Sequence, residues 1–295
     1  MQKNIYLDHA GTTYVKKEVL DEMLPYFTEN FGNPSSIYKL GQENKKVVEH
    51  AREQVAKVLN AKSGEIFFTS CGSEADNWAV KGVALANKER VNHIITSAIE
   101  HPAIMNTCKY LEKHGFEVTY LKVDKDGKVD IEELEKSIKD TTILISIMYA
   151  NNEIGTIEPI YEIAKIAKEK NIYFHTDAVQ AIGNVKIDVK KLGIDLLSLS
   201  GHKFYAPKGV GALYIRNGVK IDNFIHGGGQ ELKKRAGTEN VAGIVGLGKA
   251  IEIAYEKFDE TNKKIIKTNG MVLNFLCLIK KYFHISLDIL RGNMI

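Results

Sequence analysis

The sequence predicts an α/β fold built on a mainly parallel seven-stranded sheet with helices on both faces. Two observations lead to this prediction. Apolar, β-rich runs alternate with helical patterns through the middle of the chain, and parallel strands need such helices as crossover connections. Several of the apolar runs also stop at polar residues, as strands do when they end at a ligand site.

The predicted elements follow one another from residue 36 to residue 215. The strands are expected at Glu65–Thr69, His93–Ser97, Phe116–Leu121, Thr142–Met148, Ile172–Thr176, Ile194–Leu199 and Val210–Ile215. The helices are expected at Ser36–Asn60, Ser73–Lys88, Pro102–His114, Ile131–Lys139 and Pro159–Lys170. A longer helical pattern begins near Gly243 and continues towards Phe283, as in a helix that bridges two domains.

The composition is that of an ordinary globular protein. The 295 residues are 44% hydrophobic and 26% charged, with a net charge of +3 and no block of basic residues. We therefore expect neither nucleic acid nor a membrane as a partner. The N-terminus lacks the apolar core of a signal peptide. The three cysteines, an odd number without metal-ligand spacing, favour a reducing cytoplasm, no disulfide framework and no metal site.

Two strand ends direct an aspartate and a lysine to the same edge of the sheet. The run 171–180 carries Asp177, and the run 194–203 ends in Ser200-Gly201-His202-Lys203. Such a lysine can form a Schiff base with an aldehyde cofactor, and such an aspartate can pair with a protonated pyridine nitrogen. Pyridoxal phosphate needs both groups. A surface lysine and a turn aspartate are the simpler interpretation of either residue alone.

A phosphate site is predicted where the strand ending at Thr69 passes into a helix. Gly72 allows close approach of the backbone, and the Ser73 hydroxyl is a further donor. The free N–H groups and the dipole at a helix N-terminus bind phosphate. The alternative is a helix N-cap at Ser73 with Glu74 in the first turn. Beside a Schiff-base lysine, the phosphate site is the favoured interpretation.

Two further polar positions follow strands. His101 comes just after the strand 93–97 and can lie over a cofactor ring and move a proton. The alternative is a histidine that caps the helix beginning at Pro102. An amide from the Asn151-Asn152 pair could bond the cofactor's phenolic oxygen or a substrate carboxylate. A turn, which Asn and Gly favour, is the alternative there.

Taken together, these motifs resemble those of the pyridoxal phosphate-dependent cysteine desulfurases of the class-V aminotransferase family. The resemblance runs in order from residue 5 to about residue 250. The residues that carry it are Tyr6–Thr13, Phe31–Ser36, Asn151–Gly155, His175–Gln180, Ser200–Lys203, His226–Gln230 and Arg235–Asn240.

The resemblance implies a fold, an activity and partners. The fold is the large domain of the fold-type I enzymes, normally in a homodimer. The family removes sulfur from L-cysteine, giving L-alanine and an enzyme persulfide that serves iron–sulfur cluster assembly or thiolation. A scaffold or other sulfur-acceptor protein is thus an expected partner. Another lyase or transaminase reaction, or binding of the cofactor without catalysis, remains an alternative.

The resemblance also implies roles for particular residues. Lys203 would hold the cofactor, Asp177 would pair with its pyridine nitrogen, and His101 would stack on its ring. Gln180 and Asn152 would bond the phenolic oxygen side. The phosphate would be held by Gly72, Ser73, Ser200 and His202, together with Thr238 from the partner subunit.

Three departures from the family pattern stand out. Gly11 replaces a usual alanine, and Ala206 replaces a usual glycine. The family's sulfur-accepting loop cysteine and the following arginine lie in a C-terminal region that we expect to be missing. Cys277, in an apolar run, is expected to be a core thiol, and Cys71 to lie on the phosphate side.

These departures set the expected domain organisation and activity. Residues 1–15 would form an N-terminal segment and residues 16–250 the cofactor-binding large domain. Residues 251–295 would form a bridging helix and the remnant of a truncated small domain. Without the loop cysteine, we expect impaired turnover of cysteine.

Overall fold

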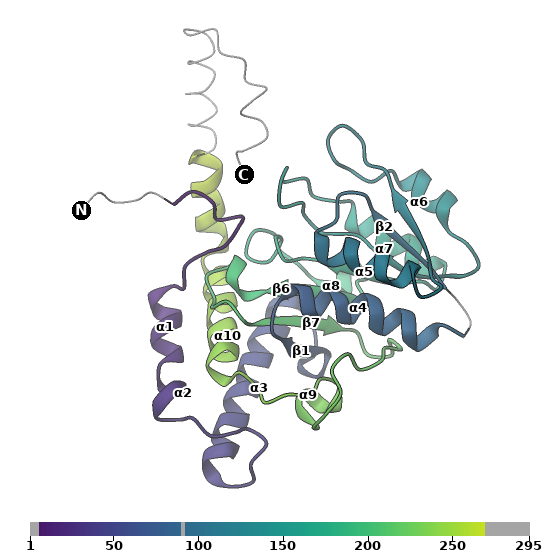
Figure 1. The fold of residues 1–295 in the computed structure, drawn as a ribbon. Helices are drawn as coiled ribbons and strands as arrows, with labels where there is room; N and C mark the ends of the chain where they lie inside the picture. The colour runs from purple at the N-terminus through teal and green to yellow at the C-terminus, as the bar shows by residue number, and fades with distance from the viewer. Residues whose placement is uncertain (1–5, 90–91, 269–295) are drawn as a thin grey trace, which may run out of the picture.

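The computed structural model describes residues 6–89 and 92–268, and a single seven-stranded sheet forms their centre (Figure 1). The strand order is β1-β7-β6-β5-β4-β2-β3. The strands are β1 (Ile66–Thr69), β2 (His93–Ser97), β3 (Glu117–Leu121), β4 (Thr142–Ser146), β5 (Tyr173–Asp177), β6 (Leu196–Ser200) and β7 (Gly211–Ile215). All seven predicted strands are confirmed, with small shifts at their ends.

Nearly all of the strands run in the same direction. β3, β2, β4, β5 and β6 are joined by parallel pairings. β7 is antiparallel to both β6 and β1, so β1 runs in the same direction as β6. The predicted mainly parallel sheet is thus confirmed, and β7 is its exception. The carboxyl ends of six strands consequently meet at one edge.

The helices predicted between the strands are also confirmed. They are α3 (Lys39–Leu59), α4 (Gly72–Asn87), α5 (Pro102–Glu112), α6 (Ile131–Ser137) and α7 (Ile160–Glu169). Four short helices were not predicted, namely α1 (Lys17–Met23), α2 (Pro25–Thr28), α8 (Val189–Leu192) and α9 (Gln230–Lys233). Two 3₁₀ turns, η1 (Ser63–Glu65) and η2 (Gly201–Lys203), precede β1 and follow β6.

The two faces of the sheet are covered by different helices (Figure 1). Neighbouring residues of one strand point to opposite faces, so Phe67 packs in the core under α4 and α5 while Phe68 packs in the other core. That second, larger core contains buried residues of α3, α7 and α10 (Val241–Glu256). Burial on both faces explains why the strands read as continuous apolar runs.

The predicted bridging helix begins as α10. Helix α10 ends at Glu256, and the backbone is helical again over residues 258–268. Residues 269–295 lie outside the described part of the chain, and with them Cys277 and most of the predicted small-domain remnant. Among the described helices, none combines the length and the apolar character needed to cross a membrane.

A buried ion pair ties α9 to α3 and β1. Arg52 Nη1 donates to Glu231 Oε2 at 2.8 Å and Nη2 donates to Oε1 at 3.0 Å, and both side chains are buried. Glu231 Oε2 also accepts the backbone N–H of Phe68 at 2.7 Å. Glu231, Leu232 and Lys233 have φ of 43°, 56° and 67°, a left-handed turn that costs about 1–3 kcal/mol per residue. The ion pair stabilises this strained turn.

We expect Glu231→Ala to lower the free energy of unfolding by about 3–5 kcal/mol, because it leaves the Arg52 guanidinium buried and unpaired. Urea unfolding followed by circular dichroism measures this loss. The control is Asp21→Ala, which breaks the exposed Lys17–Asp21 pair and should cost below about 1 kcal/mol. Equal losses in the two variants would contradict the importance given to the buried pair.

Candidate active site

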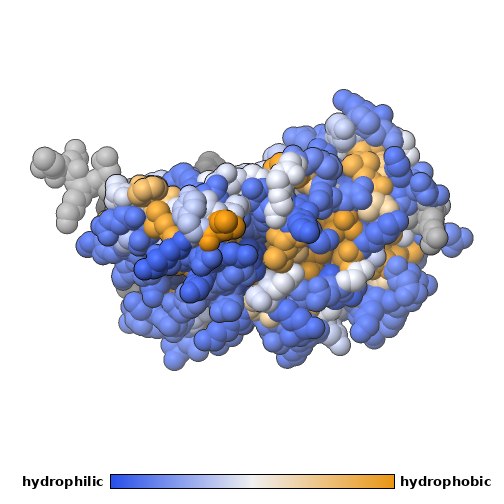
Figure 2. All heavy atoms as spheres, turned by 90° about the horizontal axis from the view of Figure 1, so that it is seen from below, coloured by the Kyte–Doolittle hydropathy of each residue, from blue (hydrophilic) through white to orange (hydrophobic). Residues whose placement is uncertain are grey.

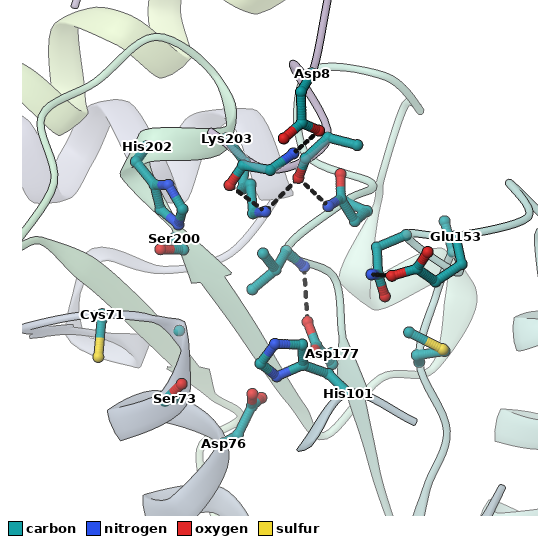
Figure 3. A pocket seen from close by; sticks show the side chains of 18 residues that line it. Asp8, Cys71, Ser73, Asp76, His101, Glu153, Asp177, Ser200, His202 and Lys203 are labelled. Carbon is teal, nitrogen blue, oxygen red and sulfur yellow. Dashed lines mark hydrogen bonds between the residues drawn. The ribbon is translucent and has the colours of Figure 1, made fainter. Parts of the chain in front are cut away.

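A cavity of about 460 Å³ opens at the carboxyl edge of the sheet (Figure 3). The segments after β1, β2, β4, β5 and β6 line it together with the N-terminal segment. Nine of the ten predicted site residues lie there: Gly72, Ser73, His101, Asn152, Asp177, Gln180, Ser200, His202 and Lys203. The shared strand direction therefore brings together residues from widely separated parts of the chain.

Lys203 enters the cavity from η2, immediately after β6. Its Nζ donates to the carbonyl oxygen of Ala10 and, at 3.0 Å, to that of Gly11. Burial lowers the pKa of Lys203, and the nearby carboxylates of Asp177 and Asp8 offset part of this effect. A lysine with a lowered pKa more readily provides the neutral amine that attacks an aldehyde.

The N-terminal segment holds the lysine loop from outside. The backbone N–H of Thr13 and its Oγ1 each donate to the His202 carbonyl at 2.9 Å. Thr12 Oγ1 lies 3.0 Å from His202 Nδ1, and Gln180 Nε2 donates to the Ala10 carbonyl at 2.9 Å. Residues 8–13 thus form part of the site, a role that the sequence alone did not reveal.

Asp177 is the last residue of β5 and is buried. Its Oδ1 accepts the backbone N–H of Val179 at 2.9 Å. Burial raises the pKa of Asp177, while the Val179 hydrogen bond and the positive charges of His101 and Lys203 oppose that rise. A buried carboxyl with few cationic partners favours a cation that enters the cavity beside it.

His101 is both a helix cap and a residue of the cavity wall. Its Nδ1 accepts the backbone N–H of Ala103 at 3.1 Å, at the start of α5. The ring is exposed and points over Asp177 in Figure 3. The two interpretations of His101 are therefore compatible, because the cap fixes the ring at the mouth of the cavity.

The N-terminus of α4 forms another wall. Cys71 is the N-cap residue and Ser73 lies inside the first turn, so the alternative of an N-cap at Ser73 is wrong. A Cβ at Gly72 would lie 2.8 Å from Val179 Cγ2 and 3.3 Å from Ser200 Cβ, so this close approach requires glycine. The first N–H groups of a helix have no partner within it and can bind an anion.

The remaining predicted residues differ in position. Asn152 lines the cavity, whereas Asn151 shapes the turn by accepting the N–H groups of Glu153 and Ile154 at 2.8 and 3.0 Å. Cys71 lies on the cavity wall next to Gly72. Thr238 is exposed and lines a second, smaller cavity of about 110 Å³ instead.

Asp76 was not predicted and also faces the cavity. It lies on α4, three residues after Ser73, and therefore on the same helix face. Oxygens of Asp76 and Asp177 and a ring nitrogen of His101 all lie within 4.8 Å of one another.

Comparison with known proteins places this chain in a family. Residues 5–283 match the family described as aminotransferase class-V. Over 273 residues the chain is 65% identical to the cysteine desulfurase IscS of Clostridium botulinum, covering 92% of this chain and 69% of that relative. It is 61% identical over 279 residues to the IscS of Methanosarcina thermophila, covering 95% of this chain and 69% of the relative.

Solved structures share both fold and sequence with the chain. A NifS-like protein superposes with a TM-score of 0.92 at 47% identity, covering 94% of this chain and 76% of the other. SspA, solved in complex with cysteine, superposes with a TM-score of 0.83 at 45% identity, covering 84% of this chain and 72% of the other. The chain therefore belongs to the class-V aminotransferase family and, within it, to the pyridoxal phosphate-dependent cysteine desulfurases.

Proposed function

We propose that the cavity binds pyridoxal phosphate, with Lys203 Nζ bonded to the aldehyde carbon of the cofactor. One observation carries this proposal: Lys203 and Asp177 face a single cavity whose wall includes a helix N-terminus. The donor set fits the group, since a buried carboxyl suits a pyridinium and a helix N-terminus suits a phosphate. Gly72 leaves room for that phosphate to approach the backbone.

The other cavity residues fit the edges of the cofactor. We assign Gly72, Ser73, Ser200 and His202 to the phosphate, because all four line the cavity and Gly72, at the start of α4, closely approaches Ser200. Asn152 and Gln180 would bond the phenolic oxygen with their amide groups. His101, fixed by its cap at the mouth of the cavity, would cover the ring face.

The substrate we propose is L-cysteine, in keeping with the desulfurase relatives and with the cysteine complex of SspA. When bound, pyridoxal phosphate supplies an electron sink for negative charge at the substrate Cα. Lys203 Nζ, with its lowered pKa, would remove the Cα proton and His101 would return or relay protons at the open side. An acceptor thiolate would form a bond to the cysteine sulfur. The Cβ–S bond would break, and Cβ would keep its electron pair and take a proton. The products would be L-alanine and a persulfide.

We further propose that the chain works as a homodimer that passes sulfur to an iron–sulfur scaffold or another acceptor protein. Thr238 lies outside the cavity of its own subunit, as expected for a residue that completes the partner's phosphate site. Large apolar side chains are exposed in residues 24–38, among them Phe31 at 68% and Ile37 at 89%. One face of the molecule also carries a broad apolar patch (Figure 2). Such surfaces mark association sites.

The attachment at Lys203 can be tested by spectroscopy. We expect purified protein with pyridoxal phosphate to show a visible absorption band, and borohydride to fix the cofactor covalently to Lys203. Lys203→Ala should lose both signals because the nucleophilic amine is gone. The exposed Lys190→Ala is the matched control and should keep both. An unchanged band in Lys203→Ala would refute the assignment.

Removal of the Asp177 carboxylate should slow chemistry at Cα. Exchange of the L-cysteine Cα proton in D₂O, followed by NMR, measures this step without a sulfur acceptor. We expect Asp177→Ala to slow the exchange by about 100- to 1000-fold, as loss of a preorganised charge does. The exposed Asp140→Ala serves as the control and should exchange at the normal rate. Normal exchange in Asp177→Ala would contradict the pairing with the pyridine nitrogen.

The shared active site predicts a link between assembly and cofactor binding. Light scattering should give twice the mass of one chain. Thr238→Ala should weaken pyridoxal phosphate binding by about tenfold, because one hydrogen bond to a charged group is lost, and leave the mass unchanged. A monomer with full cofactor occupancy would rule out the proposed dimer.

A further inference from the structure

A second buried carboxyl group stands beside Asp177 at the inner end of the cavity. Asp76 comes from α4 and Asp177 from β5, and both side chains point towards the same place in Figure 3. Asp76 is 1% exposed and Asp177 is 5% exposed. An oxygen of each lies within 4.8 Å of the other and of a His101 ring nitrogen. The proposed cofactor contacts do not include Asp76.

Asp76 forms no ion pair with a lysine or an arginine among the described residues. Its nearest basic group is His175, whose Nε2 lies 3.8 Å from Asp76 Oδ1. Burial lowers the pKa of His175 to about 3, so this ring is neutral. Asp76 Oδ1 is buried and accepts no hydrogen bond from the described residues. By contrast, buried Asp195 pairs with Arg216 and accepts the N–H of Phe174.

The groups packed around Asp76 make its ionised form costly. They come from each neighbouring element: Cys71 at the start of α4, Glu100 and His101 before α5, His175 and Asp177 on β5, and Ser198 on β6. Burial raises the pKa of Asp76 well above its usual range, and the charges of Asp177 and Glu100 raise it further, while a hydrogen bond from Ser198 offsets part of this rise. Burial also raises the pKa of Glu100 to about 8. Two carboxyl groups this close do not both ionise readily.

A chain of hydrogen bonds through Ser146, His175 and Ser198 leads to Asp76. Ser146 Oγ lies 2.8 Å from His175 Nδ1, and His175 Nε2 lies 2.9 Å from Ser198 Oγ. A neutral histidine that accepts from Ser146 donates to Ser198, which frees the Ser198 hydroxyl hydrogen for the Asp76 side. This chain fixes the position of Asp76 without supplying a positive charge.

We propose that Asp76 is a positioning residue of the cofactor site, kept as a neutral carboxylic acid so that Asp177 alone presents a negative charge to the pyridine nitrogen. The inference rests on the proposed function. The Val179 N–H stabilises the Asp177 anion, and the positive charges of His101 and Lys203 also favour it. The pair therefore holds one proton, on Asp76, and one charge, on Asp177.

The first test uses cofactor-free protein and compares the wild type with Asp76→Asn, a neutral isostere. A carboxyl whose pKa is raised on folding contributes stability below its unfolded pKa and loses it as the pH rises towards its folded pKa. The wild type should therefore lose stability relative to Asp76→Asn, by up to about tenfold in the unfolding constant per pH unit above about pH 4. Urea unfolding at a series of pH values measures this difference.

The matched control is Asp195→Asn, which removes a buried charge that has a partner. Arg216 and the Phe174 N–H stabilise ionised Asp195, so this variant should be less stable than the wild type at neutral pH. By contrast, Asp76→Asn should be no less stable than the wild type at neutral pH. If Asp76→Asn also lost stability against the wild type as the pH rose, Asp76 would be ionised in the folded protein and the proposal would be overturned.

The second test measures the Kd of pyridoxal phosphate by absorbance titration. Asp76→Asn should bind within about threefold of the wild type at pH 7, and Asp76→Ala should bind about tenfold more weakly because the polar contact is lost. Asp177→Asn should bind far more weakly than either. Weak binding by Asp76→Asn equal to that of Asp177→Asn would overturn the proposal. Failure of the wild type itself to bind would refute the proposed function and the role of Asp76 with it, whatever the unfolding series gave.

Discussion

The shared direction of six strands is the constraint on which the rest of this structure depends. Because β1, β2, β4, β5 and β6 all end at one edge, five separate loops deliver their first residues to a single cavity. The antiparallel β7 carries the chain back between β6 and β1, and so places the α4 N-terminus beside the lysine turn. A one-residue slip in any of these strands would turn its site residue to another face.

The charged side chains of this protein form two groups, which differ in whether a partner of opposite charge compensates them. Arg52 with Glu231, and Asp195 with Arg216, are compensated by a partner and serve the fold. Lys203, Asp177 and Asp76 share a cavity where burial works against their charged forms and partners are few. Titratable groups with shifted pKa values thus gather at the cavity, as expected where a protein supplies acid–base chemistry. The compensated pairs elsewhere provide the stability that such a site costs.

The sheet and most of the candidate site could be predicted because the ends of strands can be recognised in the sequence. Apolar runs that stop at Asp177, Ser200 and Lys203 identify the edge of the sheet directly. Short helices such as α2 and α9 could not be predicted, since α9 depends on long-range contacts such as that of Glu231 with Arg52. Asp76 was missed for a related reason: its meaning comes from β5, a hundred residues away, and not from its own helix. Tertiary contacts override local pattern in both cases.

The hydrogen bonds between residues 12–13 and the turn η2 have a consequence for how the protein folds during its synthesis. Thr13 bonds the carbonyl of His202, a residue 189 positions later in the chain. During synthesis residues 12–13 emerge before β6 and η2, yet their binding site exists only once β6 and η2 have been translated. Closing so long a loop is slow compared with local folding. The cavity is therefore among the last features to assemble, and Lys203 stays open to solvent until residues 10–13 pack against it.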